Sequence, residues 1–168
     1  MQGRLKRRYQ IHKELSRSSY FQGEIDVGEL SRLGELLANS DSVIEADFEF
    51  RRSDFDLPML SGKVQGNLEM ECQRCLQAMV TPIQLDFKLL IDAPDDIVRD
   101  SCLDTVYSED GFINFFEVVE DELILALPLV AMHEHDSCNK HWQVPESDLE
   151  PAVRENPFLI LKDLKTTH

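Results

Sequence analysis

The sequence lacks any apolar run that approaches the length of a membrane span, and no hydrophobic leader follows Met1. Its first residues are basic and polar instead, so we expect a cytoplasmic protein that does not enter a membrane. Cysteine is also scarce, with four in 168 residues. Since no export signal is seen, these cysteines are expected to be thiols or metal ligands rather than a disulfide framework.

The sequence also lacks the short motifs of the common catalytic machineries. It contains no nucleophile elbow, no P-loop and no dinucleotide-binding fingerprint. The acidic run Glu120-Asp121-Glu122 invites an acid–base or magnesium interpretation, but a magnesium site needs further oxygen ligands that nothing in the sequence identifies. We therefore expect a solvated helix face at this run, and a protein that is not an enzyme.

Positive charge is concentrated at the N-terminus. The chain has a formal net charge of -15, whereas residues 1–20 carry about +5, so the rest holds about -20. Such an acidic body repels the phosphate backbone of nucleic acids over most of its surface. Two kinds of partner remain: RNA bound by a basic N-terminal arm, or a basic protein bound by the acidic surface. A third alternative is that the acidity only keeps the protein soluble. The basic residues of the arm are Arg4, Lys6, Arg7, Arg8, Lys13 and Arg17.

The hydrophobic pattern indicates an α+β fold. Apolar and polar residues alternate in three runs, at 46–50, 64–72 and 83–91, which predicts an antiparallel sheet with one solvated face. Leucines at helical spacing in 30–37 and an apolar stripe in 114–127 predict helices that pack on this sheet.

The domain organisation follows from these elements. Residues 1–20 are predicted to form the basic arm and residues 21–168 a single α+β domain. Within this domain we expect an acidic loop at 93–111, an irregular segment at 133–155 and a C-terminal helix that begins at Asn156-Pro157.

A C-x-x-C pair, Cys72 and Cys75, closes the second alternating run. Two thiolates at this spacing can bind one zinc ion, which needs two further ligands, here Cys138 with His133, His135 or His141. The alternative is that Cys72 is a small core residue, Cys75 caps a turn and the histidines are solvated. Redox chemistry is disfavoured, because the first cysteine ends a strand and no helical pattern follows before Pro82.

Three segments, in order, resemble the YceD family of large ribosomal RNA subunit accumulation proteins. They are the run Leu68-Glu69-Met70-Glu71-Cys72-Gln73-Arg74-Cys75, the helix Val119-Glu120-Asp121-Glu122-Leu123-Ile124-Leu125-Ala126-Leu127-Pro128, and the closing Asn156-Pro157-Phe158. The matched motif residues are Cys72, Arg74, Cys75, Glu120, Asp121, Glu122 and Pro128. More distant members carry additional cysteines after the helix in a zinc-ribbon-like arrangement, whereas this chain offers only Cys138 with nearby histidines. The resemblance therefore supports zinc as a cofactor, with Cys72, Cys75, Cys138 and His133 as candidate ligands, but implies a metal site less strongly here than in those relatives.

The resemblance implies a non-enzymatic role in the accumulation of 23S ribosomal RNA and in large-subunit biogenesis. The implied partner is a ribosomal protein or pre-ribosomal particle, with ribosomal RNA bound through the N-terminal arm as a further mode. The charge distribution favours the protein partner slightly. The alternative function is a zinc-stabilised interaction module with an unrelated partner.

Overall fold

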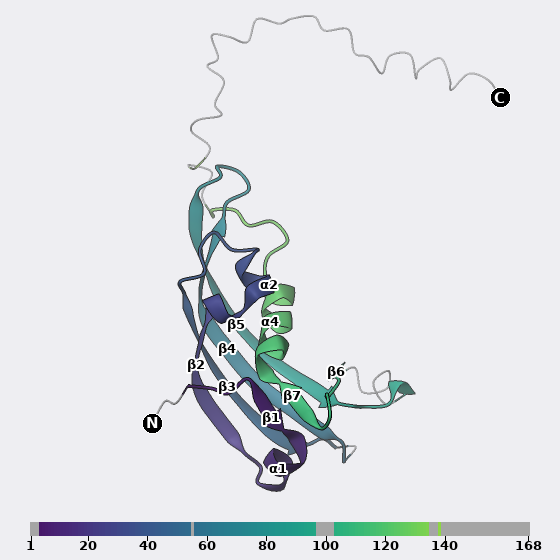
Figure 1. Ribbon diagram of the computed structural model, residues 1–168. Helices are drawn as coiled ribbons and strands as arrows, with labels where there is room; N and C mark the ends of the chain where they lie inside the picture. The colour runs from purple at the N-terminus through teal and green to yellow at the C-terminus, as the bar shows by residue number, and fades with distance from the viewer. Residues whose placement is uncertain (1–3, 55, 97–102, 135–137, 139–168) are drawn as a thin grey trace, which may run out of the picture. The chain divides into compact units, whose positions relative to one another are not determined.

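The computed structural model describes residues 4–54, 56–96, 103–134 and 138 (Figure 1). The chain divides into two units, Met1–Glu134 and His135–His168, and the fold below is that of the first. The helix predicted at Asn156-Pro157 and nearly all of the irregular segment 133–155 lie outside the described residues.

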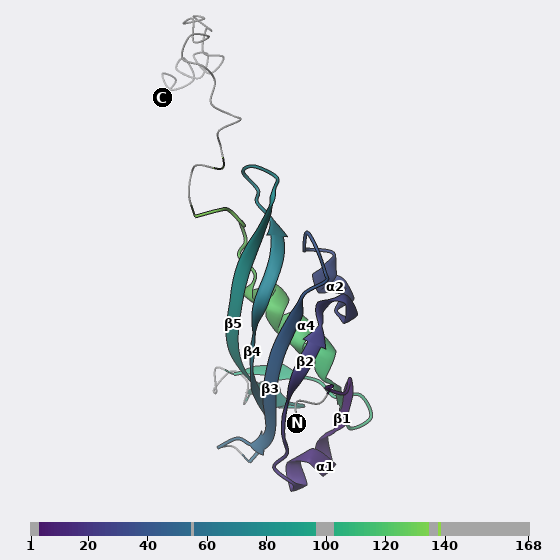
Figure 2. The same cartoon turned by 90° about the vertical axis from the view of Figure 1, so that its left-hand side faces the viewer.

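A five-stranded sheet forms the body of the first unit, with strand order β2-β3-β4-β5-β6 (Figure 2). Neighbouring strands are antiparallel except β5 and β6, which are parallel. The long strands arise where apolar and polar residues alternate, since that pattern gives each strand one buried and one wet face. The strands are β2 (Tyr20–Asp26), β3 (Val43–Arg52), β4 (Pro58–Glu71), β5 (Ala78–Ile91) and β6 (Asp104–Val106).

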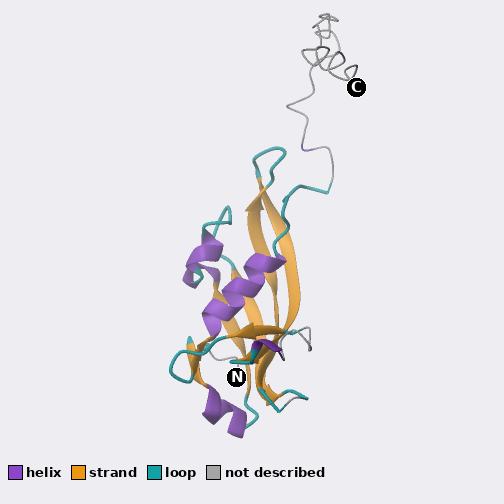
Figure 3. Ribbon diagram, turned by 90° about the vertical axis from the view of Figure 1, so that its right-hand side faces the viewer, coloured by secondary structure: helices purple, strands orange, loops and turns teal. Residues whose placement is uncertain are grey.

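Helices cover one face of this sheet and leave most of the other, called the open face below, exposed; at one end of it Met59 and Leu90 are buried in a small separate cluster. Figure 3 shows α4 lying across the near face of the strands, while Figure 2, from the opposite side, shows the strands in front of it. The expected α+β class, a sheet with a few packed helices, is confirmed. The helical segments are α1 (Ile11–Ser16), the 3-10 turn η1 (Val27–Glu29), α2 (Ser31–Gly34) and α4 (Phe115–Ala126).

The core lies between the helix-covered face of the sheet and α4. Phe48 of β3 and Phe115 of α4 are both fully buried, and their rings stack with centroids 3.6 Å apart. Tyr9 packs edge-on against the ring of Phe48 at 5.2 Å. Gly62 in β4 leaves room for this packing, because a Cβ there would lie 2.8 Å from the Cβ of Phe48.

The first residues of the chain are folded into the first unit. Strand β1 (Arg8–Gln10) pairs antiparallel with β7 (Phe112–Asn114), and α1 follows it directly. Leu5, Tyr9 and Ile11 are buried in the main core. These apolar side chains dock the segment that we expected to be a separate basic arm, and its cations project from a packed surface.

Two other elements differ from the sequence-based expectation. The acidic region 93–111, expected to be a loop, contains β6, which pairs with β5. The leucine helix expected in 30–37 is reduced to α2, a single turn of four residues. Both are too short for their periodicity to stand out in a sequence.

Candidate metal centre

The tip of the β4–β5 hairpin positions the C-x-x-C pair. Cys72 directly follows β4, and its N–H donates to the Gln77 carbonyl at 2.9 Å. The Leu76 N–H donates to the Cys72 carbonyl at 2.8 Å, and Leu76 has a φ of 59°. This left-handed conformation is unfavourable for leucine, so the surrounding bonds hold the tip in a defined shape.

His133 reaches the hairpin tip through the segment that follows α4. The Gln73 N–H donates to the Ala131 carbonyl at 2.8 Å, which fixes this segment beside the turn. The Nδ1 atom of His133 lies 3.5 Å from the Sγ atom of Cys75. The ligand atoms of Cys72, Cys75 and His133 all lie within 4.8 Å of one another. Such separations suit a tetrahedral zinc ion with bonds of about 2.0–2.3 Å.

The surroundings of Cys72 favour its thiolate form, the form that binds metals. Its side chain is fully buried, and burial by itself raises a thiol pKa. Burial is outweighed by hydrogen bonds from the backbone N–H groups of His133, Arg74 and Cys75, so the pKa of Cys72 falls to about 5. A tip that presents N–H groups to this sulfur is therefore suited to zinc at neutral pH.

Cys138 is the fourth ligand expected from the sequence. It is partly buried and belongs to the unit His135–His168. Cys138 is the fifth residue after His133, and five residues of extended chain can span up to about 17 Å. His135 and His141, the alternative ligands considered from the sequence, lie outside the described residues.

Two other motif residues lie close in sequence to candidate ligands, Arg74 between Cys72 and Cys75, and Pro128 five residues before His133. The Arg74 guanidinium is 3.6 Å from the Sδ atom of Met132, on the segment that carries His133. Pro128 lies two residues beyond the end of α4, after Leu127, whose N–H still donates to the Leu123 carbonyl. Proline cannot continue the helical ladder, so the chain leaves α4 here and turns toward the hairpin tip.

The acidic run on α4 is not a uniformly solvated face, and that prediction is wrong for Glu120. Glu120 is 5% exposed, and its Oε1 atom accepts hydrogen bonds from the backbone N–H groups of Arg32 (2.7 Å) and Leu33 (3.1 Å). Its Oε2 atom lies 3.0 Å from the Arg32 guanidinium. Glu120 therefore satisfies the free N–H groups at the start of α2 and ties that turn to α4.

The neighbours of Glu120 have different surroundings. Asp121 is exposed and forms an ion pair with Arg32 at 2.7 Å. The pKa of Glu122 is raised, first by burial and then by the negative charges of Asp104 and Asp121. The three carboxylates thus do not converge on one point as a magnesium site would require.

The six basic residues of the N-terminal segment are exposed and distributed over several elements. Arg4 and Arg7 both form ion pairs with Glu29. The Arg7 guanidinium also lies over the Phe116 ring at 4.8 Å, and that of Arg8 over the Phe112 ring at 5.2 Å. The exposed set is Arg4, Lys6, Arg7, Arg8, Lys13 and Arg17.

The helices in the described part of the chain are all too short or too polar to span a membrane.

Comparison with known proteins identifies the family. The family model described as Large ribosomal RNA subunit accumulation protein YceD matches residues 60–165, a range that includes the hairpin tip and α4. A Haemophilus influenzae protein of that same name is 34% identical over 164 residues, which cover 91% of this chain and 91% of the relative. No solved structure matches the chain. Because the family model matches more than half of the chain and the relative is 34% identical over nearly its whole length, this chain belongs to the YceD family.

Proposed function

We propose that this protein is a non-enzymatic binding factor that supports the accumulation of large-subunit ribosomal RNA in the cytoplasm. The similarity to a relative named for that role, over nearly its whole length, is the observation that carries the proposal. The protein would act by binding a ribosomal protein, free or within a pre-ribosomal particle.

The open face of the sheet, which is the face opposite α4, supports a basic protein as the partner. On β3, the acidic side chains of Glu45, Asp47 and Glu49 all lie on this face, because they alternate with residues that are buried in the core. Two bases of this face, Arg51 and Lys63, lie 3.4 Å and 3.6 Å from carboxylates of the same face. The surplus negative charge attracts a basic protein and repels RNA phosphates.

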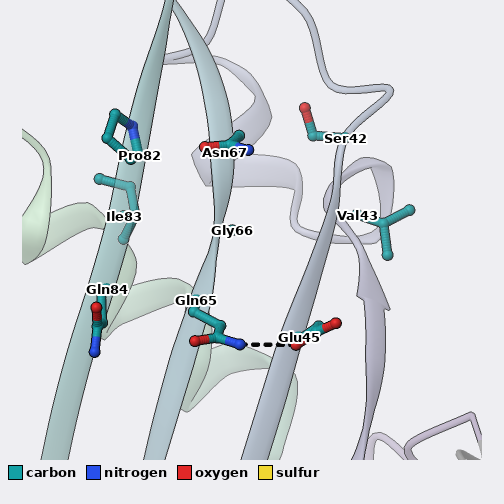
Figure 4. A pocket seen from close by; sticks show the side chains of 9 residues that line it. All are labelled: Ser42, Val43, Glu45, Gln65, Gly66, Asn67, Pro82, Ile83 and Gln84. Carbon is teal, nitrogen blue, oxygen red and sulfur yellow. Dashed lines mark hydrogen bonds between the residues drawn. The ribbon is translucent and has the colours of Figure 1, made fainter.

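A shallow hollow on the open face has the lining of a binding surface. Figure 4 shows Gln65 beside the Glu45 carboxylate, with the amide of Asn67 further along β4 and that of Gln84 on the neighbouring strand β5. The Gln65 Nε2 atom donates to a Glu45 oxygen at 2.8 Å. The three amides, on the neighbouring strands β4 and β5, can form hydrogen bonds, and Glu45 adds one negative charge. Such a lining suits polar recognition of a protein segment.

Zinc has a structural part in this proposal. With Cys138, the ligand that the sequence offers from the second unit, Cys72, Cys75 and His133 would give the four nitrogen and sulfur ligands of a closed tetrahedral site. A closed site leaves no position for a substrate, so the metal would hold the hairpin tip and the segment after α4 together. The second candidate function, a zinc-stabilised module with an unrelated partner, uses the same site.

Depletion of the protein from its own cells tests the role. We expect the ratio of large- to small-subunit ribosomal RNA to fall, and large-subunit precursors to accumulate in sucrose gradients. A plasmid-borne copy should restore the ratio. Depletion that leaves the ratio and the gradient unchanged would favour the unrelated-partner module.

A further inference from the structure

Strand β2 is an edge strand of the sheet, next to β3 alone (Figure 2). Two backbone bonds, from Phe50 N–H to Ser19 (3.0 Å) and from Val27 N–H to Ser42 (2.9 Å), continue the β2–β3 register at either end. Bonded and non-bonded pairs alternate in an antiparallel ladder, so the odd-numbered residues 19–27 bond to β3. The N–H and C=O groups of the even-numbered residues therefore point toward the free edge.

These outward-pointing groups are unpaired in the part of the chain that the structure describes. No backbone hydrogen bond there joins Tyr20, Gln22, Glu24 or Asp26 to another segment. An edge of this kind is a template for a further strand. β2 contains neither proline nor lysine, the two residues that most often protect an edge strand, and its charges are the acids Glu24 and Asp26.

The same four residues carry the side chains that β2 places on the open face, and all four are exposed. Across the ladder, Glu24 lies opposite Glu45, and Gln22 lies opposite Asp47. Like charges at opposed positions destabilise a sheet. None of the ion pairs between described residues involves Glu24, Asp26 or Asp47. Lys63 lies opposite Asp47 on the next strand, so the uncompensated charge of this part of the face is that of Glu24 and Asp26 on β2.

We propose that the β2 edge binds an extended lysine- and arginine-rich segment of a protein partner by strand addition. The partner's backbone would pair with the outward N–H and C=O groups, and its alternate basic side chains would lie over Glu24 and Asp26. A second copy of this chain is disfavoured, because β2 against β2 would bring these acids together. RNA has no peptide backbone to pair with the edge. The inference rests on the proposed function, which supplies the class of partner, a basic ribosomal protein.

The direct test uses a fluorescent peptide of about ten residues in which lysine alternates with valine or threonine. Binding to the full-length protein is followed by anisotropy at low salt. The edge variant carries Glu24→Gln and Asp26→Asn. The control variant carries Glu35→Gln and Glu117→Gln, which remove the same charge from exposed positions just after α2 and on α4.

We expect the edge variant to weaken peptide binding by roughly three- to tenfold, as for two exposed ion pairs, and the control variant to stay within about twofold. A peptide N-methylated at alternate residues keeps its charge but cannot pair through those amides, and should bind at least about tenfold more weakly. Amide exchange of Gln22, Glu24 and Asp26 should slow on binding. Equal losses in both variants, or no effect of N-methylation, would overturn strand addition.

Complementation separates this inference from the proposed function. Depleted cells that recover their ribosomal RNA ratio with the wild-type chain, and equally well with the edge variant, would retain the proposed function and overturn the edge as its binding site. Peptide binding at the edge, in a protein whose depletion leaves ribosomal RNA unchanged, would retain the edge and overturn the role.

Discussion

Protein purified without chelators should contain about one zinc ion per chain, and Cys72→Ser should lose nearly all of it. Cys72 is buried at the centre of the hairpin tip, with three backbone N–H groups directed at its sulfur. Structural zinc sites have binding free energies of about 10–16 kcal/mol in small domains, so loss of a ligand should lower the free energy of unfolding by about 3 kcal/mol or more. Elemental analysis and urea unfolding, with and without chelator, measure both effects.

Cys102 provides the matched control for this experiment. It is outside the proposed ligand set, so Cys102→Ser should retain zinc. Cobalt substitution tests the fourth ligand: the thiolate charge-transfer band should weaken in Cys72→Ser, Cys75→Ser and Cys138→Ser alike. Protein with little zinc, and with a stability that chelator does not change, would show that the thiols have no metal-binding role.

Glu120→Ala should lower the free energy of unfolding by about 3 kcal/mol, with no metal involved. The carboxylate accepts two backbone N–H groups from the start of α2 and lies within 3.1 Å of the Arg32 guanidinium. Alanine leaves those N–H groups without an acceptor in a buried site, and each such loss costs about 1–3 kcal/mol. Urea denaturation followed by circular dichroism measures the change.

Two further substitutions show whether the Glu120 contacts cause the effect. Glu117→Ala changes an exposed glutamate of the same helix and should cost no more than about 0.5 kcal/mol. Glu120→Gln keeps an amide oxygen as acceptor but removes the charge, so its cost should fall between the two. Equal stability of the Glu117→Ala and Glu120→Ala proteins would mean that the contacts with α2 contribute nothing.

The three long strands and α4 could be predicted because local pattern determines them. Phe48 and Phe50 alternate with polar neighbours, and this period of two is visible over a whole strand. Strands β1, β6 and β7 have three residues each and form only because a partner segment lies beside them. Such strands carry no period of their own, so the sequence could not reveal them.

The candidate site was predictable in its local part only. The spacing of Cys72 and Cys75 identified the thiol pair, and the hairpin tip brings His133 to it. The burial of Glu120 was missed, because its partners Arg32 and Leu33 lie 88 and 87 residues away in sequence. An acidic residue among other acids on a helix resembles a solvated one until its long-range partners are known. The signal available was Arg32, a lone base on a four-residue helix.

The claim that the acidic face binds a basic ribosomal protein can be tested by pull-down of the tagged protein from cell extract. The recovered proteins are identified by mass spectrometry at low and high salt, with and without RNase. We expect recovery of a basic large-subunit ribosomal protein that survives RNase, declines at high salt and is reduced by Glu24→Gln with Asp26→Asn. Recovery of ribosomal components that RNase abolishes would contradict binding through the acidic face, as would their absence at low salt.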